Sequence, residues 1–222
     1  MDIFGLIQAL SALDTIQRIS VYVIPVIFAI TVHEAAHGYT ARHFGDMTAA
    51  AAGRITLNPI RHIDPVGTLL VPTITMLLGG ILFGWAKPVP VNFSRLRNPK
   101  RDMLWVAAAG PGANLAMALL WAMAIKIAPS LPAYAATPVA LMGAAGIMIN
   151  TVLMVLNLLP LPPLDGGRIA VSLLPHPWAM RFAKIEPYGF IILLLLMFTN
   201  ILGIIMWPLI LATLQLISWI FF

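Results

Sequence analysis

Apolar residues follow one another along this chain in runs of about twenty or more, separated by short segments that hold most of the charged residues. A helix of about 20 residues spans the hydrocarbon core of a bilayer, so the pattern predicts several membrane-spanning helices. Two further apolar segments are less regular because proline, glycine or asparagine interrupts them. The spanning helices are expected at about residues 19–44, 103–127 and 139–159, and the less regular segments at 66–85 and 189–222.

The polar segments constrain how the apolar ones cross the membrane. Arginine and lysine follow the first predicted helix and fill the loop 87–101, whereas the loop 128–138 has no charged residue. By the positive-inside rule the first two regions are cytoplasmic and the third is external. Segment 66–85 therefore makes no net crossing, and we expect it to enter the membrane and return or to lie on its surface.

The remaining segments complete the expected architecture. Residues 1–20 are mildly amphipathic and are expected at the membrane interface. The stretch 45–65 contains turn and breaker residues, and within it residues 49–57 are expected to be extended, able to form a short strand pair. Segment 189–222 is long for one span, and Asn200, Gly203 and Pro208 offer places where it could break into two shorter helices.

Composition indicates that the membrane holds the whole chain. Of its 222 residues 60% are hydrophobic and 9% are charged, whereas soluble domains carry about 25% charged residues. We therefore predict an all-α polytopic membrane protein, a helical bundle with a small extended or β segment and a re-entrant segment near the active site. One domain is expected over residues 1–222, with its core at about 19–175 and C-terminal hydrophobic helices at about 189–222. The net charge of +5 fits basic loops facing an anionic leaflet, and nucleic acid is not expected as a partner.

The first predicted span contains ionisable residues where apolar side chains are expected: His33, Glu34 and His37. Charged groups at such positions cost about 3 kcal/mol each on membrane-insertion scales, so they indicate a functional site. Residues four apart share a helix face, which lets both imidazoles bind one metal ion. Glu34 follows the first histidine and is placed to act as a general base on metal-activated water. The alternative is that the three side chains only hydrogen-bond inside a helix bundle.

A catalytic zinc ion takes three protein ligands, so the two histidines require a third. The chain has no cysteine, which leaves histidine, aspartate or glutamate. Asp165 is the strongest candidate because it follows an apolar span and precedes Gly166 and Gly167, which permit close approach of the backbone. The alternative is that Asp165 caps a helix that begins near Arg168.

Two asparagines in the apolar spans require hydrogen-bond partners where they are buried. Asn157 lies eight residues before Asp165. It could stabilise the oxyanion of a tetrahedral intermediate, hold a substrate strand or join two helices. Asn114 follows Gly110 and Pro111 in a stretch whose small residues indicate a close helix contact, and a structural hydrogen bond across that contact is expected.

Together these motifs resemble the site-2 protease family of intramembrane zinc metalloproteases, peptidase family M50. The motifs that carry the resemblance are His33-Glu34-x-x-His37, Ala108-Ala109-Gly110-Pro111-x-x-Asn114, and Asn157-x-x-Pro160-x-x-x-Leu164-Asp165-Gly166. They follow the family's order over about residues 20–175. The chain has no room for a PDZ domain or a pair of CBS domains, so it is similar to the minimal prokaryotic members.

The resemblance implies a site and a reaction. The implied ligands of one Zn²⁺ per chain are His33, His37 and Asp165. The implied catalytic residues are Glu34, as general base, and Asn157, in contact with substrate or intermediate. Implied substrates are transmembrane proteins or peptides, hydrolysed in or near their spanning segments in the course of regulated intramembrane proteolysis. The implied setting is the lipid bilayer of a prokaryotic plasma membrane, with the active site toward the cytoplasm and residues 49–57 pairing with unwound substrate.

Two other classes of protein are consistent with single features of the chain. A transporter or metal-permeation protein could use the same residues as a transit site, but transporters usually contain inverted repeats, and the sequence shows none. A catalytically silent membrane binding protein of the same fold could lose the base without cost, so the intact Glu34 favours an enzyme.

Overall fold

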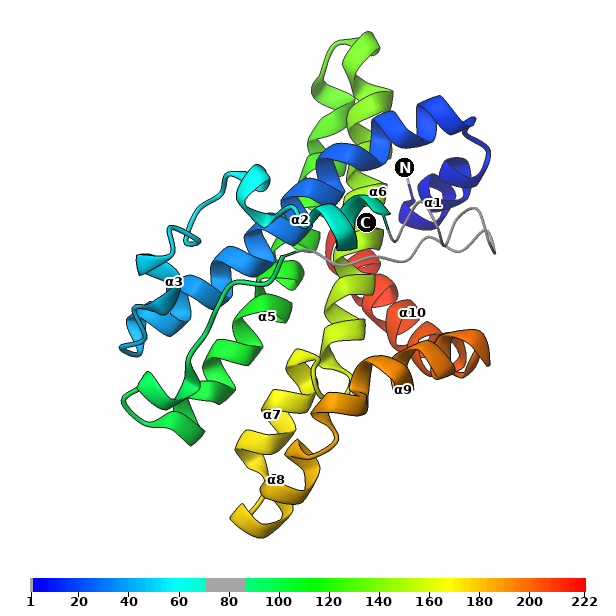
Figure 1. Cartoon of the computed structure of the whole chain (residues 1–222). Helices are drawn as coiled ribbons and strands as arrows, with labels where there is room; N and C mark the ends of the chain where they lie inside the picture. Colours follow the sequence, from blue (N-terminus) through cyan, green and yellow to red (C-terminus); the bar gives the residue numbers. More distant parts are fainter. Residues whose placement is uncertain (1, 71–86) are drawn as a thin grey trace.

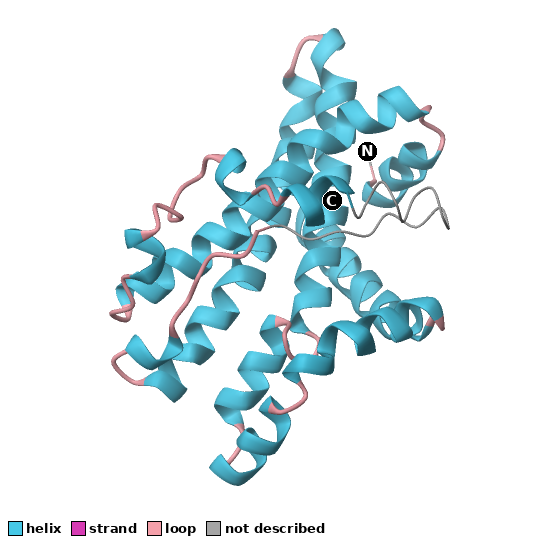
Figure 2. Cartoon of the chain, viewed as in Figure 1, coloured by secondary structure: helices cyan, strands magenta, loops and turns pink. Residues whose placement is uncertain are grey.

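The computed structural model describes residues 2–70 and 87–222, and within these ranges the chain consists of helices and loops (Figures 1 and 2). The α-helices are α1 (Ile3–Ser11), α2 (Thr15–His43), α3 (Thr48–Ala51), α5 (Pro99–Ile127), α6 (Ala133–Leu158), α7 (Asp165–Leu173), α8 (His176–Ala183), α9 (Glu186–Phe198) and α10 (Ile201–Phe221). Three short 3₁₀ helices are η1 (Pro59–His62), η3 (Phe93–Arg95) and η4 (Ala128–Ser130), and η2 (Pro65–Leu70) is a π-helical turn.

Four helices of the described part are long and apolar enough to cross a membrane: Thr15–His43, Pro99–Ser130, Ala133–Leu158 and Ile201–Phe221. Large apolar side chains such as Phe28, Leu120 and Ile204 are exposed on these helices, as expected for surfaces that face lipid. The prediction of an all-α polytopic membrane protein is therefore confirmed.

Helices α2, α5 and α6 pack against one another and form the centre of the molecule. Small residues such as Ala29, Ala118 and Ala144 are buried at their contacts, which brings the backbones close together. Figure 1 shows α1 and α10 beside α6, and α7 below the end of α6. Because α7 also packs against α5, the residues at its beginning lie next to the central helices.

The predicted spans are found, and two of them begin at residues that start a helix well. Asp14 and Gln17 form a capping box, so α2 begins before residue 19. Proline at the first position starts α5 at Pro99. The C-terminal apolar segment is broken where Asn200 adopts a left-handed conformation (φ 61°), whereas Pro208 lies inside α10. Of the predicted re-entrant segment 66–85, residues 71–85 lie outside the described residues.

The strand pair predicted for residues 49–57 is wrong, because the first part of this stretch is helical. The carboxylate of Asp46 accepts a hydrogen bond from Thr48 N (2.9 Å), and the alanines that follow are the best helix formers. Gly53 ends α3 in the left-handed region (φ 62°), with Gly53 N donating to Ala50 O and Arg54 N to Ala49 O in a Schellman motif. The long non-helical segment beside α2 is 87–92 instead (Figure 2).

Candidate metal centre

His33 and His37 lie one turn apart on α2, and each ring is held by a hydrogen bond at Nδ1. His33 Nδ1 lies 2.6 Å from Asn114 Oδ1, and His37 Nδ1 lies 2.7 Å from the carbonyl oxygen of Val106. Both partners belong to α5 and both are acceptors, so each imidazole carries its proton on Nδ1 and donates it. In the neutral form of each ring this places the lone pair on Nε2, the usual arrangement of histidines that bind a metal.

Asp165 is the first residue of α7, and its carboxylate points at the two histidines. Gly166 and Gly167 make the turn between α6 and α7 possible, because a Cβ on Gly166 would overlap the carbonyl oxygens of Leu158 and Leu159. The N-cap of α7 is Leu164, without a side-chain hydrogen bond. The alternative in which Asp165 caps a helix near Arg168 is therefore wrong.

Asp165 Oδ2 is buried and accepts no conventional hydrogen bond in the structure. The carboxylate is therefore enclosed by protein and directed at the Nε2 atoms of His33 and His37.

The three ligand atoms form a nearly equilateral triangle. His33 Nε2 and His37 Nε2 are 3.1 Å apart, and Asp165 Oδ2 lies 3.4 Å from the first and 3.3 Å from the second. Zinc bonds of about 2.0–2.1 Å at tetrahedral angles separate ligand atoms by about 3.3 Å. Two bare imidazole lone pairs and a carboxylate at this spacing repel one another unless a cation lies among them. The donor set and its spacing therefore fit a zinc ion with one open position.

Gly110 of α5 lies directly against the histidines. A Cβ on Gly110 would overlap His37 Nε2 and also His33 Cε1 (2.5 Å) and His33 Nε2 (2.6 Å). Helix α5 can therefore approach the centre only because this residue has no side chain. Gly112, two residues further along the same helix, has no atom within 4 Å of an added Cβ.

Glu34 contacts the non-helical segment 87–92. Its Oε2 accepts a 2.7 Å hydrogen bond from Val89 N. Val89 lies between Pro88 and Pro90, which have no N–H, so it supplies the one backbone donor of that tripeptide. The carboxylate of Glu34 is thereby oriented by backbone rather than by another side chain, which leaves its second oxygen available.

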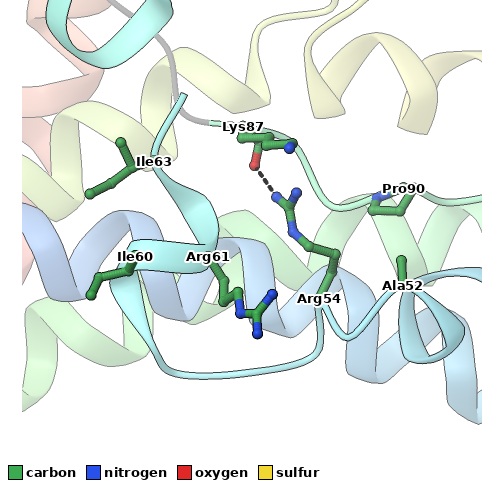
Figure 3. A pocket seen from close by; sticks show the side chains of 7 residues that line it. All are labelled: Ala52, Arg54, Ile60, Arg61, Ile63, Lys87 and Pro90. Atoms are coloured by element: carbon green, nitrogen blue, oxygen red, sulfur yellow. Dashed lines mark hydrogen bonds between the residues drawn. The ribbon is translucent and has the colours of Figure 1, made fainter. Parts of the chain in front are cut away.

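The segment 87–92 is fastened on its other side by Arg54. Arg54 is 8% exposed, and its Nη2 donates to the carbonyl oxygens of Lys87 (2.7 Å) and Pro88 (3.3 Å), as Figure 3 shows for Lys87. Lys87 N donates to His62 O (2.9 Å), and Asn92 N donates to Asp46 Oδ2 (2.7 Å). The pocket beside this segment, about 580 Å³ in volume, is lined by Arg54, Arg61 and Lys87 among others and includes none of the three candidate ligands.

The structure brings together most, but not all, of the predicted site residues. Among the described residues, His33, His37 and Asp165 form a group of ligand atoms within 4.8 Å of one another. Asn157 instead donates its amide to Leu153 O (3.0 Å) within α6. Asn114, expected to be structural, bonds directly to His33.

Sequence reasoning missed the contributions of Asn150 and Val89. Asn150 is fully buried and bonds to Asn114. The sequence signal that could have identified it is a polar residue within an apolar span. Val89 acts through its backbone, and the signal available for it was an N–H between two prolines.

Comparison with known proteins identifies the class to which such a site belongs. The sequence model of peptidase family M50 matches residues 124–198. A Bacillus subtilis (strain 168) protein named "Putative zinc metalloprotease YwhC" is 41% identical over 190 residues, 84% of this chain and 84% of that protein. Two proteins named "Putative zinc metalloprotease Rip2" are also similar. The one from Mycolicibacterium smegmatis is 32% identical over 202 residues (86% of this chain, 74% of that protein), and the one from Mycobacterium tuberculosis H37Rv is 33% identical over 188 residues (81% and 69%).

No solved structure matches the chain significantly. These three relatives match between 81% and 86% of the chain. The fold and the buried centre define a metal-dependent hydrolase of the membrane, and the chain belongs to peptidase family M50. It is a zinc metalloprotease.

The close contact between Gly110 and the two histidines provides a test of where the zinc binds. Gly110→Ala is expected to displace both imidazoles, because the new methyl group would overlap their metal-binding nitrogens. Zinc per chain, measured by elemental analysis of detergent-purified protein, should fall to less than a fifth of the wild-type value. Gly112→Ala is the matched control and should bind as much zinc as wild type. Equal zinc in the two variants would show that the centre does not lie against Gly110.

Proposed function

We propose that this protein is an intramembrane protease that hydrolyses peptide bonds in or near the spanning segments of other membrane proteins. In this proposal His33, His37 and Asp165 hold one zinc ion and Glu34 is the general base. The observation that supports it most strongly is the buried triangle of ligand atoms on a helix able to span the membrane. A soluble peptidase has no reason to place such a centre on a spanning helix, where polar groups are costly.

The depth of the centre fits a membrane-embedded substrate. His37 lies six residues before the end of α2, which corresponds to about 9 Å along a helix axis. The last turn of α2 carries Arg42 and His43, and positive charge marks the cytoplasmic side. The proposed active site therefore lies within the membrane near its cytoplasmic face, in a prokaryotic plasma membrane.

The chemistry follows from the residues around the centre. When bound, zinc supplies a Lewis acid that lowers the pKa of water to about 7. Glu34 takes a proton from the attacking water and later delivers it to the leaving amine. The hydrogen bond from Val89 N keeps one oxygen of Glu34 occupied, so that the other oxygen is the one that accepts the proton.

The substrate must present an accessible peptide bond at this centre. In a helical substrate each carbonyl is hydrogen-bonded along the helix, so the segment to be cut has to unwind locally. Asn157 is proposed to contact the unwound substrate or the oxyanion that forms from it. For this role its amide has to leave the Leu153 carbonyl, to which it donates in the structure.

The base assignment is tested with Glu34→Gln. The amide cannot take a proton, so cleavage should be abolished while the zinc ligands remain in place. Detergent-purified wild type and variant would be incubated with a panel of single-span transmembrane peptides, with products scored by mass spectrometry. Zinc per chain, measured on the same samples, is the control and should be unchanged. Turnover within tenfold of wild type would contradict the role of Glu34.

The role of Asn157 is tested with Asn157→Ala in the same assay. If the side chain stabilises the oxyanion, cleavage should slow by about 10²-fold with zinc content unchanged. Thermal unfolding of the variant in detergent gives the comparison, because a residue that only packs would change stability and leave turnover intact. Wild-type turnover together with lowered thermal stability would return Asn157 to a packing role.

A further inference from the structure

Two asparagines are fully buried among the apolar side chains of the central helices. Asn114 of α5 and Asn150 of α6 are both 0% exposed. Placing an amide in such surroundings is strongly unfavourable unless it is hydrogen-bonded. A hydrogen bond between two membrane helices typically adds only modest stability, so joining the helices is a weak reason to bury two amides.

The two amides form a continuous chain of hydrogen bonds that ends at a candidate zinc ligand. Asn150 Nδ2 donates to Gly146 O (2.8 Å), and Asn150 Oδ1 accepts from Asn114 Nδ2 (2.9 Å). Asn114 Nδ2 also lies 3.3 Å from Ala29 O, one turn before His33 on α2. Asn114 Oδ1 lies 2.6 Å from His33 Nδ1. The chain therefore connects α6, α5 and α2.

The direction of every bond in this chain follows from its backbone ends. The carbonyl oxygens of Gly146 and Ala29 can only accept, so the NH₂ groups of both asparagines must face them. The amide oxygens consequently face the other way, and Asn114 presents an acceptor to His33. An acceptor at this position requires His33 to carry its proton on Nδ1, which leaves the lone pair of Nε2 free toward the centre.

We infer that Asn150 is a positioning residue for the zinc centre, acting through Asn114 to set the tautomer and ring orientation of His33. The inference rests on the proposed ligand set. Asn150 itself touches none of the three candidate ligands in the described contacts. His37 is oriented by the backbone carbonyl of Val106, so its tautomer does not depend on any replaceable side chain. We call the hydrogen bonds from Asn150 through Asn114 to His33 the relay. Loss of the relay is therefore expected to affect His33 and not His37.

The magnitude expected for such a relay separates it from simple packing. Residues that orient metal ligands through hydrogen bonds typically change metal affinity by 10–100-fold when they are replaced. A residue that only joins α5 to α6 would change the thermal stability of the protein and leave the affinity of the folded form unchanged. Zinc affinity and stability are therefore measured separately.

The chain offers a matched control in the next residue. Thr151 is also fully buried, and its hydroxyl has no hydrogen-bond partner in the structure. Thr151→Val keeps the volume of that side chain and removes only the unpartnered hydroxyl. Asn150→Leu replaces the amide with an apolar side chain of similar size and thereby removes the relay.

The experiment measures zinc dissociation constants of detergent-purified, full-length protein by competition with a chelator. Asn150→Leu should bind zinc 10–100-fold more weakly than wild type, Asn114→Leu at least as weakly, and Thr151→Val within twofold of wild type. Thermal unfolding of the zinc-free proteins shows whether each variant is folded. Affinity in folded Asn150→Leu equal to that of Thr151→Val would overturn the inference.

A second measurement uses the wild type and does not depend on whether a variant folds. In zinc-free protein with ¹⁵N-labelled histidine, and with His33→Gln for assignment, the ring of His33 should carry its proton on Nδ1. A proton on Nε2 of neutral His33 would contradict the relay. Absence of zinc binding by wild type would instead refute the proposed ligand set, and the state of the His33 ring would still decide whether the relay exists.

Discussion

The structure depends on the convergence of two imidazole lone pairs and one carboxylate at a single point among apolar helices. Without a cation these groups would repel one another and lose the hydration that each has in water. With a cation of suitable size the same arrangement is favourable, since zinc prefers three such ligands at the observed spacing. Metal binding and the packing of the central helices are therefore linked. The surrounding residues allow the two imidazoles and the carboxylate to approach one another.

Three helices far apart in the sequence supply this centre, and each makes a different contribution. Helix α2 carries the two histidines at the spacing of one turn. Helix α5 contributes Gly110, which permits its close approach, and the acceptors that orient both rings. Helix α7 brings in Asp165 because two glycines allow the chain to turn tightly after α6. A side chain at any of these glycines would separate elements that the chemistry requires to be in contact.

The spans, and the placement of His33 beside His37, could be predicted because they depend on local rules. Long apolar runs indicate spanning helices, and the spacing of His33 and His37 places them on one face. The strand pair at 49–57 failed because consecutive alanines after Asp46 favour a helical turn, which Gly53 then ends. The roles of Asn150 and Val89 could not be predicted, because one depends on the direction of amides across three helices and the other on a backbone N–H. Side-chain patterns contain neither kind of information.

The measurement that tests the central claim most directly is zinc per chain in Asp165→Ala beside wild type, by elemental analysis of detergent-purified protein. Glu186→Ala is the matched control, because Glu186 is a carboxylate that pairs with Arg168 outside the centre. The account predicts one zinc in wild type and in Glu186→Ala and much less in Asp165→Ala. Equal zinc in Asp165→Ala and wild type would show that the carboxylate of α7 does not complete the site.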